Sequence, residues 1–180
     1  MYYYTLQTPA APAPSDPKTE FVLGVEHFRA PEILRDDRIV YYVSSTQINF
    51  YQHHRWGSDP ATLLSEFTAR WLQNSGVFAE VKMLPLRERV DYTLGGRLLS
   101  FEEVDAEGAP KVRLVLALTL VRSSDHKRVW SSEERQETPI SERGVEGVAS
   151  ALNASCDQAL QKMIPGLLAQ VEKDFQGNGK

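Results

Sequence analysis

The sequence predicts an α+β fold, a two-layer sandwich in which a mainly antiparallel sheet of about six strands has two amphipathic helices packed on one face. Two patterns predict this fold. Segments with alternating apolar residues, typical of half-buried strands, fill much of the chain, and two segments carry apolar residues three and four positions apart, typical of helices. The 180 residues, 42% of them hydrophobic, are enough for one domain with its own core.

The N-terminal residues 1–18 are predicted to form a short strand and a connector. Residues 2–6 have the aromatic content of a strand that pairs with the sheet or docks on a partner. Residues 9–17 contain four prolines, which forbid a helix and favour an extended link. The α+β domain is expected over residues 19–175, followed by a disordered tail over residues 176–180.

Three strands are expected in the first part of the domain, over residues 21–28, 38–44 and 46–51. In the first, Phe21, Leu23 and Val25 alternate with other residues in the manner of a half-buried strand. The second and third are separated so closely that a tight hairpin is expected at Ser44 and Ser45.

A helix is predicted over residues 60–74. Asp59 can cap its exposed backbone donors, and Pro60 suits the first helical position. Gly76 supplies a left-handed terminator after the last apolar residue of the helix. A strand over residues 77–83 follows, and Pro85 ends it.

Two long strands over residues 91–104 and 111–122 are expected to form a hairpin. Both faces of the second strand are apolar, which indicates a central place in the sheet. In the first strand, Gly95 and Gly96 interrupt the pattern and indicate a bulge or a close backbone approach. The charged strand over residues 127–137 is expected at or near an edge.

The last element is predicted to be an amphipathic helix over residues 142–173. Its apolar residues keep a three-four spacing from Val145 to Val171, and Ser141 can cap its start. Pro165 lies inside this pattern. Because proline costs about 3 kcal/mol in a helix interior, we expect a bend or break near residues 161–164.

Composition and charge exclude several classes of function. The apolar run over residues 114–121 is far shorter than the roughly 20 residues of a membrane-spanning helix. The 20 basic residues against 24 acidic ones give a net charge of −4, and no basic stripe is present, so nucleic acid is not expected as a partner.

No cofactor, metal site or catalytic residue is expected. His53 and His54 are adjacent on an extended segment and point to opposite faces, whereas His27 and His126 lie on separate elements. Cys156, the single cysteine, falls on the apolar stripe of the last helix, where burial keeps a thiol protonated. The chain has no Gly-x-Ser-x-Gly motif, and its paired glutamates read as solvated strand faces.

Aromatic residues outside the apolar stripes are unusually numerous. Core packing is the first interpretation, but one small sheet and its helices cannot bury them all, so an exposed partner-docking surface is a second hypothesis. These residues are Tyr2, Tyr3, Tyr4, Tyr41, Tyr42, Phe50, Tyr51 and Trp56.

Four short motifs occur in a characteristic order. They are Tyr3-Tyr4-Thr5-Leu6, Asp37-Arg38-Ile39-Val40-Tyr41, Arg55-Trp56 just before the capped helix, and Asp91-Tyr92-Thr93-Leu94 leading to Phe101-Glu102. In their order and spacing, over nearly the whole chain, they resemble the ABC-type transport auxiliary lipoprotein family. Members of that family usually have proline after the arginine of the second motif, where this chain has Ile39, which indicates a divergent branch.

The resemblance implies a periplasmic lipoprotein, held to a membrane by an acylated cysteine upstream of the tyrosines, with the outer membrane favoured over the inner. It also implies partners, an ABC transporter and an MCE-domain periplasmic protein that move lipids or other hydrophobic solutes. A bound lipid and a homo-oligomer stay open.

The resemblance and the aromatic pattern together nominate two sets of residues. Structural roles are favoured for the matched motif positions, so Arg38 and Tyr41 are expected to stabilise the fold. The partner-binding set consists of Tyr3, Tyr4, Tyr42, Arg55 and Trp56.

The function expected is therefore that of a non-catalytic accessory lipoprotein that binds a transporter partner. Two alternatives remain. A small periplasmic hydrolase or ligand-binding protein would show a deep pocket with a polar constellation. A purely envelope-structural lipoprotein would lack a transporter partner.

Overall fold

In the computed structural model, residues 1–9, 19–85, 88–105 and 109–177 are described, and they form two layers, a sheet covered on one face by two helices. The sheet in this part of the chain has eight strands rather than about six. The strands are β1 (Tyr2–Tyr4), β2 (Val22–Val25), β3 (Arg38–Tyr42), β4 (Ile48–Trp56), β5 (Glu80–Met83), β6 (Tyr92–Val104), β7 (Lys111–Arg122) and β8 (Arg128–Pro139). The helices are α1 (Pro60–Asn74) and α2 (Val145–Gly177), with a short 3-10 turn, η1 (Glu32–Leu34).

The long strand β6 organises the sheet. Along its whole length it pairs antiparallel with β7, which pairs in turn with β8. On its other side, β6 pairs parallel with β2 near its start and with β3 near its end. Strand β5 extends the sheet beyond β2, and β4 and β1 extend it beyond β3. The sheet is therefore mixed, with antiparallel pairing in its longest ladders.

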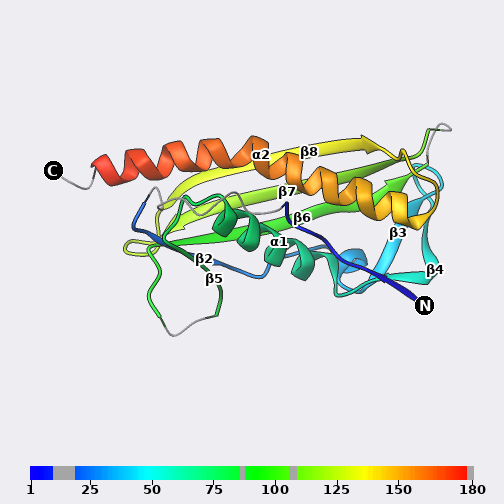
Figure 1. The fold of residues 1–180 in the computed structure, drawn as a ribbon, viewed down its shortest axis with the longest axis horizontal. Coiled ribbons are helices and arrows are strands. Elements are labelled where there is room, and N and C mark those ends of the chain that lie inside the picture. The colour runs from blue at the N-terminus through cyan, green and yellow to red at the C-terminus, as the bar shows by residue number, and fades with distance from the viewer. Residues whose placement is uncertain (10–18, 86–87, 106–108, 178–180) are drawn as a thin grey trace.

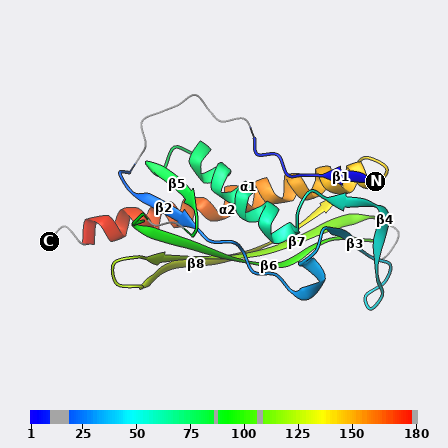
Figure 2. The same cartoon turned by 90° about the horizontal axis from the view of Figure 1, so that it is seen from below.

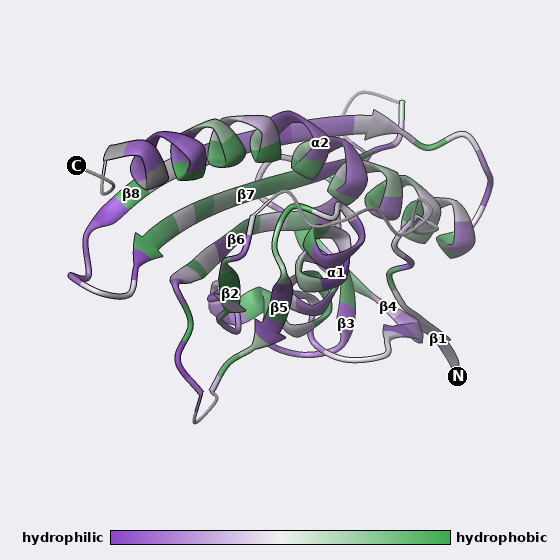
Figure 3. Cartoon of the chain, turned by 60° about the vertical axis from the view of Figure 1, so that its left-hand side comes forward, coloured by the Kyte–Doolittle hydropathy of each residue, from purple (hydrophilic) through white to green (hydrophobic). Residues whose placement is uncertain are grey.

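The helices α1 and α2 lie on the same face of the sheet, as predicted (Figure 2). The core fills the space between the two layers, where alternate residues of β7 from Val112 to Leu120 are fully buried. Figure 3 shows β7 mostly hydrophobic along its length and β8 mostly hydrophilic. Strand β8 pairs only with β7 among the described residues, which agrees with its predicted edge position. Within the same residues, no helix combines the length and apolarity that crossing a membrane needs.

The first helix begins and ends where the sequence predicts. The Asp59 side chain accepts a hydrogen bond from the backbone N–H of Thr62 at 3.0 Å, and Pro60 occupies the first turn. Gly76 has a φ of 65°, the left-handed conformation that ends many helices.

The second helix differs from its prediction. It begins at Val145, after Gly144 with a φ of 87°, rather than next to Ser141. It continues through Pro165 to Gly177, so a break near residues 161–164 is wrong, whereas a bend there stays a prediction. Met163, Ile164 and Leu167 are buried against the sheet around this proline, and this packing offsets the hydrogen bond that proline cannot make.

The other predicted boundaries shift modestly. Strands β2 and β5 are shorter than expected, and β4 runs through His53 to Trp56 because it pairs with both β3 and β1. Most of the predicted connector, residues 10–18, lies outside the described residues, as do residues 178–180 of the predicted tail.

Gly96 shows the close approach expected at the paired glycines of β6. A Cβ atom at this position would lie 2.4 Å from Cδ1 of Phe28, whose ring is buried. The segment after β2 runs alongside β6 here, since the Arg29 N–H donates to the Gly96 carbonyl at 2.9 Å. The ladder irregularity itself lies further along, between Leu98 and Ser100.

Candidate partner-binding surface

Four of the five predicted partner-binding residues lie where β1 pairs with β4, namely Tyr3, Tyr4, Arg55 and Trp56. Tyr42 lies apart from them, at the other end of β3. Strand β1 runs parallel to β4, with Tyr2 opposite His54, Tyr3 opposite Arg55 and Tyr4 opposite Trp56. In Figure 2 this corner lies beside the first turns of α2. The far edge of β1 pairs with no strand in the described part of the chain. This corner is therefore an open sheet edge with aromatic side chains.

Tyr2 and Tyr3 are the most exposed tyrosines of this edge, with 62% and 66% of their surfaces accessible. Tyr2 stacks on the His54 ring at a centroid distance of 5.1 Å, and Tyr4 stacks on it at 5.7 Å. Tyr3 is the alternate residue, so it points to the opposite face of the strand. The edge thus offers one tyrosine on each of its faces.

Tyr4 is the member of this set that joins the two layers. Its hydroxyl lies 2.7 Å from Nδ1 of His54 and donates to Oε1 of Glu146, in the first turn of α2, at 3.0 Å. Burial, helped by the bond to Glu146, raises the pKa of Tyr4 to about 12. Tyr4 is therefore a positioning residue for β1, because it holds the exposed edge against the helix.

The chain after β1 is also held on α2. The Gln7 N–H donates to Oδ1 of Asn153 at 2.7 Å, and Nδ2 of Asn153 donates to the Gln7 carbonyl at 3.1 Å. Leu6, the residue before Gln7, is buried in the core. Two side chains of one helix, Glu146 and Asn153, thus position the N-terminal strand.

Trp56 is not part of the accessible surface. Only 1% of it is exposed, and its ring packs against Phe101 at a centroid distance of 5.2 Å. The structure therefore corrects its inclusion among residues that touch a partner: an indole buried in the core stabilises the fold instead. A structural role for the whole Arg55-Trp56 motif stays a prediction.

Arg38 and Arg55 face each other across β3 and β4, and each has a carboxylate next to it. Arg38 pairs with Asp36 at 2.6 Å and lies 3.9 Å from the centre of the Phe50 ring. The bond from Arg38 holds the pKa of Asp36 below its usual value. Arg55 lies 3.6 Å from Asp37 and donates to the Tyr51 carbonyl at 2.5 Å. Through these contacts, both guanidiniums stabilise the pairing of β3 with β4.

Tyr41 and Tyr42 lie at the end of β3 and are half-buried. Tyr41 packs on Tyr51, with centroids 4.8 Å apart, and the Tyr51 hydroxyl donates to Oε2 of Glu103 at 2.5 Å. Burial, reinforced by this bond, raises the pKa of Tyr51 above its usual range. Tyr42 packs against the core from its rim. A structural role for Tyr41 stays a prediction.

His54 and Glu146 are the residues of this site that the sequence analysis did not select. His54 was considered only as a metal ligand, and Glu146 only as part of a helix. Their roles depend on the β1–β4 register and on where α2 begins, and neither follows from a local pattern.

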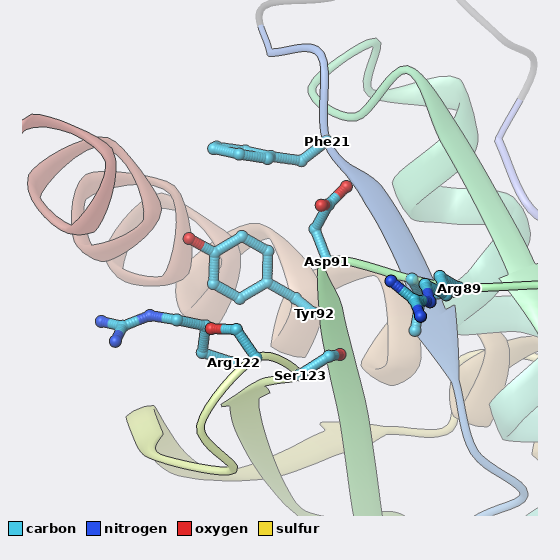
Figure 4. A pocket seen from close by; sticks show the side chains of 8 residues that line it. Phe21, Arg89, Asp91, Tyr92, Arg122 and Ser123 are labelled. Carbon is cyan, nitrogen blue, oxygen red and sulfur yellow. The ribbon is translucent and has the colours of Figure 1, made fainter. Parts of the chain in front are cut away.

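A hollow of about 580 Å³ lies at the other end of the sheet, beyond the start of β6 (Figure 4). Phe21 and Tyr92 meet edge to face in it, at 5.2 Å. The Tyr92 hydroxyl donates to Asp174 at 2.8 Å, and Arg122 forms an ion pair with the same carboxylate. Arg122, more than Tyr92, holds the pKa of Asp174 below its usual value, although burial opposes this.

The hollow offers binding groups rather than an activated nucleophile. The buried Oγ of Ser123 has no hydrogen-bond partner among the described residues, so no base is positioned to activate it. Burial raises the pKa of the Cys156 thiol, which keeps it protonated in the core. No three His, Cys, Asp or Glu side chains gather as metal ligands in the described ranges.

Fold and surface together define a two-layer α+β domain with an open aromatic edge. The chain belongs to the family of ABC-type transport auxiliary lipoprotein components, whose family model matches residues 4–164. Its family is thus one of envelope-associated lipoproteins that assist ABC transport. No curated protein matches the chain.

Solved structures show the same fold. A Xanthomonas campestris protein of family DUF330 superposes with a TM-score of 0.86 at 24% identity, covering 98% of this chain and 99% of that one. PelC from Paraburkholderia phytofirmans, a dodecamer, gives 0.51 at 15% identity, with 87% and 93% covered. A Chlamydia trachomatis protein gives 0.54 at 6% identity, with 85% and 98% covered. At these identities the likeness concerns the fold alone.

Proposed function

We propose that this chain is the non-catalytic periplasmic accessory lipoprotein of an ABC/MCE-type system that transports lipids or other hydrophobic solutes, and that it acts by binding a transporter partner. Membership of the auxiliary lipoprotein family supports the transport role. The observation that carries the binding role is the exposure of Tyr2 and Tyr3, at 62% and 66%, on a strand with an open edge.

The proposed docking surface, which we call the aromatic edge, consists of Tyr2, Tyr3, Tyr4 and Arg55. Tyr42, at the other end of β3, is proposed as an additional contact. Exposed tyrosines suit a protein interface because each combines a large apolar ring with a hydrogen-bonding hydroxyl. The open edge of β1 also offers backbone donors and acceptors to an added strand. The MCE-domain protein is the partner we propose for this surface.

The membrane anchor is proposed on the same side of the molecule. The resemblance places the acylated cysteine upstream of the tyrosines, so the aromatic edge would follow the anchor in the chain. Several acyl chains, at about 0.8 kcal/mol per buried methylene, hold a domain firmly at a bilayer. We favour the outer membrane.

Capture of the partner tests the proposal. The tagged full-length lipoprotein should recover the MCE protein from solubilised envelopes, and a Tyr2→Ser, Tyr3→Ser double variant should lose most of that recovery. Leu99→Ser is the matched control, because Leu99 is also an exposed apolar side chain, at 36%, but lies on β6. Repeated recovery of no transporter component would favour the envelope-structural alternative, and equal recovery by the double variant would exclude the aromatic edge.

One observation favours ligand binding as a second function, namely the hollow around Tyr92. Its aromatic walls suit a small amphipathic molecule, as does the Ser123 hydroxyl, which has no hydrogen-bond partner within the described ranges. Native mass spectrometry of protein purified from envelopes would detect such a ligand, and Tyr92→Leu should release it. A homo-oligomer remains a further proposal, prompted by the PelC dodecamer and tested by light scattering.

A further inference from the structure

Two pairs of arginines face each other across neighbouring segments of the sheet, and they differ in one respect. In the first, Arg38 and Arg55, each guanidinium has an aspartate beside it. In the second, Arg29 lies opposite Arg97 in a parallel bridge, and neither guanidinium pairs with a carboxylate in the described part of the chain. Like charges directly opposite each other destabilise a sheet unless a counter-charge lies near.

Both side chains of the second pair lie on the open face of the sheet. Their chain neighbours Phe28 and Leu98 are buried on the helix-covered side, and successive residues of an extended chain point to opposite faces. Arg29 and Arg97 are exposed, and both line the same two hollows on that face. The two positive charges are therefore accessible to a ligand from solvent.

The sheet surface formed by β6 and β7 beside the two arginines has room for a small ligand group. Gly95 lies opposite Thr119, and Arg97 lies opposite Ala117, in the ladder of β6 and β7. These small side chains leave a hollow of about 310 Å³ next to the guanidiniums. The Thr119 hydroxyl adds a further hydrogen-bond donor to this lining.

We propose that Arg29 and Arg97 form a binding site for a phosphate-type oxyanion on the open face of the sheet. The planar guanidinium matches a phosphate with two parallel hydrogen bonds, and two guanidiniums can share one phosphate. The ligand supplies the negative charge that aspartates supply to the other arginine pair. The argument rests on this pair alone and is independent of the aromatic edge.

The surroundings allow two sources of the same phosphate chemistry. On the far side of the arginines, Ala30, Pro31 and Leu99 line a neighbouring apolar hollow. A free phosphate would use the arginines only. The headgroup of an anionic lipid would use the arginines and lay its apolar part along this second hollow.

Among the described residues, Glu26 is the one carboxylate that lines the polar hollow. A Cβ atom on Gly95 would lie 3.0 Å from its Oε2, so the carboxylate lies over this sheet surface without pairing with either arginine. A bound phosphate would be repelled by it. Glu26→Gln should therefore tighten phosphate binding, whereas a site for a cation would weaken.

The direct test is calorimetric titration of the purified chain with inorganic phosphate. A second experiment measures co-sedimentation of the chain with vesicles, either of phosphatidylglycerol mixed with phosphatidylcholine or of phosphatidylcholine alone. Arg29→Gln and Arg97→Gln should each weaken binding about tenfold. Arg128→Gln removes the same charge from an exposed arginine of β8 and should change binding little. Binding of phosphate supports a free anion, and binding only to phosphatidylglycerol vesicles supports the headgroup.

Thermal unfolding gives a second readout that does not depend on affinity. In phosphate-free buffer of low ionic strength, Arg97→Gln should be at least as stable as the parent chain, because it removes a repulsion. Adding phosphate should raise the unfolding temperature of the parent chain more than that of the variant at the same phosphate concentration. The proposal is wrong if neither probe binds, or if both arginine variants bind as Arg128→Gln does.

Discussion

The Tyr4 hydroxyl donates a hydrogen bond to Glu146 at 3.0 Å and so connects the third residue of β1 to the first turn of α2, 142 residues further along the chain. The same hydroxyl lies 2.7 Å from Nδ1 of His54 on the neighbouring strand. One side chain therefore fixes the edge strand to both layers of the sandwich. The exposed Tyr2 and Tyr3, which precede it in the strand, depend on this attachment for their orientation.

Tyr4→Phe should loosen β1 while leaving the core intact. A hydrogen bond of this kind contributes about 0.5–1.5 kcal/mol to stability, and the loss should fall mainly on local opening of the strand. Hydrogen exchange measured by mass spectrometry should show faster exchange over residues 2–7 and 53–57. Tyr3→Phe is the control. Because Tyr3 is 66% exposed, this substitution removes only a hydroxyl that faces solvent. Equal exchange in both variants would contradict the role given to the Tyr4 bond.

Trp56→Ala should destabilise the whole domain. The indole is 1% exposed and packs on Phe101, and removing a buried aromatic side chain costs about 3–5 kcal/mol. Urea unfolding followed by circular dichroism would measure this loss. Tyr3→Ala, on the exposed neighbouring strand, should change stability little. If the Trp56→Ala variant is stable but fails to capture the transporter partner, Trp56 contacts the partner directly, and its burial in the core does not explain its role.

Local patterns predicted α1 completely, because its signals are all local: Asp59 caps it, Pro60 starts it and Gly76 ends it. They also predicted the two faces of β7 and the edge position of β8. The parallel pairings of β2 and β3 with β6 were beyond this kind of analysis, since pairing between distant segments leaves no short-range pattern.

The candidate site was predicted only in part for the same reason. The tyrosine-rich start of the chain was selected because its rings exceed what the core can bury, and Tyr2 and Tyr3 are indeed exposed. Burial of Trp56 depends on the β4–β6 packing that no local signal reveals. The open arginine pair is equally invisible in sequence, since Arg29 and Arg97 become neighbours only through the bridge between them.

The two adjacent glycines of β6 should respond in opposite ways to alanine. Gly96→Ala should destabilise by about 1–3 kcal/mol, because the new Cβ would overlap the buried Phe28 ring. Gly95→Ala should stay within about 0.5 kcal/mol of the parent chain, because its Cβ would meet only the mobile end of the Glu26 side chain. Chemical denaturation of both variants would measure the difference.

A Phe28→Leu change in the Gly96→Ala background serves as a check, because a smaller side chain makes room for the methyl group. Partial recovery of stability in the double variant is expected. If Gly95→Ala and Gly96→Ala cost the same, the close approach of Phe28 is not what requires glycine in this strand.

Pro165→Ala should stabilise the domain. Pro165 lies on the solvent-exposed side of α2 and deprives the preceding turn of one backbone hydrogen bond. Because the helix is already continuous there, alanine needs no rearrangement, and a gain of about 1–3 kcal/mol is expected. The thermal unfolding midpoint would show it. Gln158→Ala, at another exposed position of the helix, should change the midpoint far less, and an unchanged midpoint for Pro165→Ala would mean that the proline strains the helix little.

Glu102→Gln should raise stability at neutral pH. Glu102 is 5% exposed, and burial raises its pKa, although the Phe101 N–H donates to its carboxylate at 2.6 Å and Arg113 lies 3.6 Å away. A carboxyl with a raised pKa in the folded state holds its proton more tightly there than in the unfolded chain. Its contribution to stability is therefore complete below the ordinary glutamate pKa and is lost as pH rises through the folded value.

Glutamine mimics the protonated carboxyl and still accepts the Phe101 hydrogen bond, so the variant should lack this part of the pH dependence. Urea unfolding at pH 4 and pH 7 would measure it: the two proteins should be close in stability at the lower pH, and the variant should be the more stable at the higher. Glu133→Gln, an exposed glutamate of β8, is the control for the change in net charge. A variant less stable than the parent chain at pH 7 would show instead that attraction to Arg113 outweighs the cost of burying the charge.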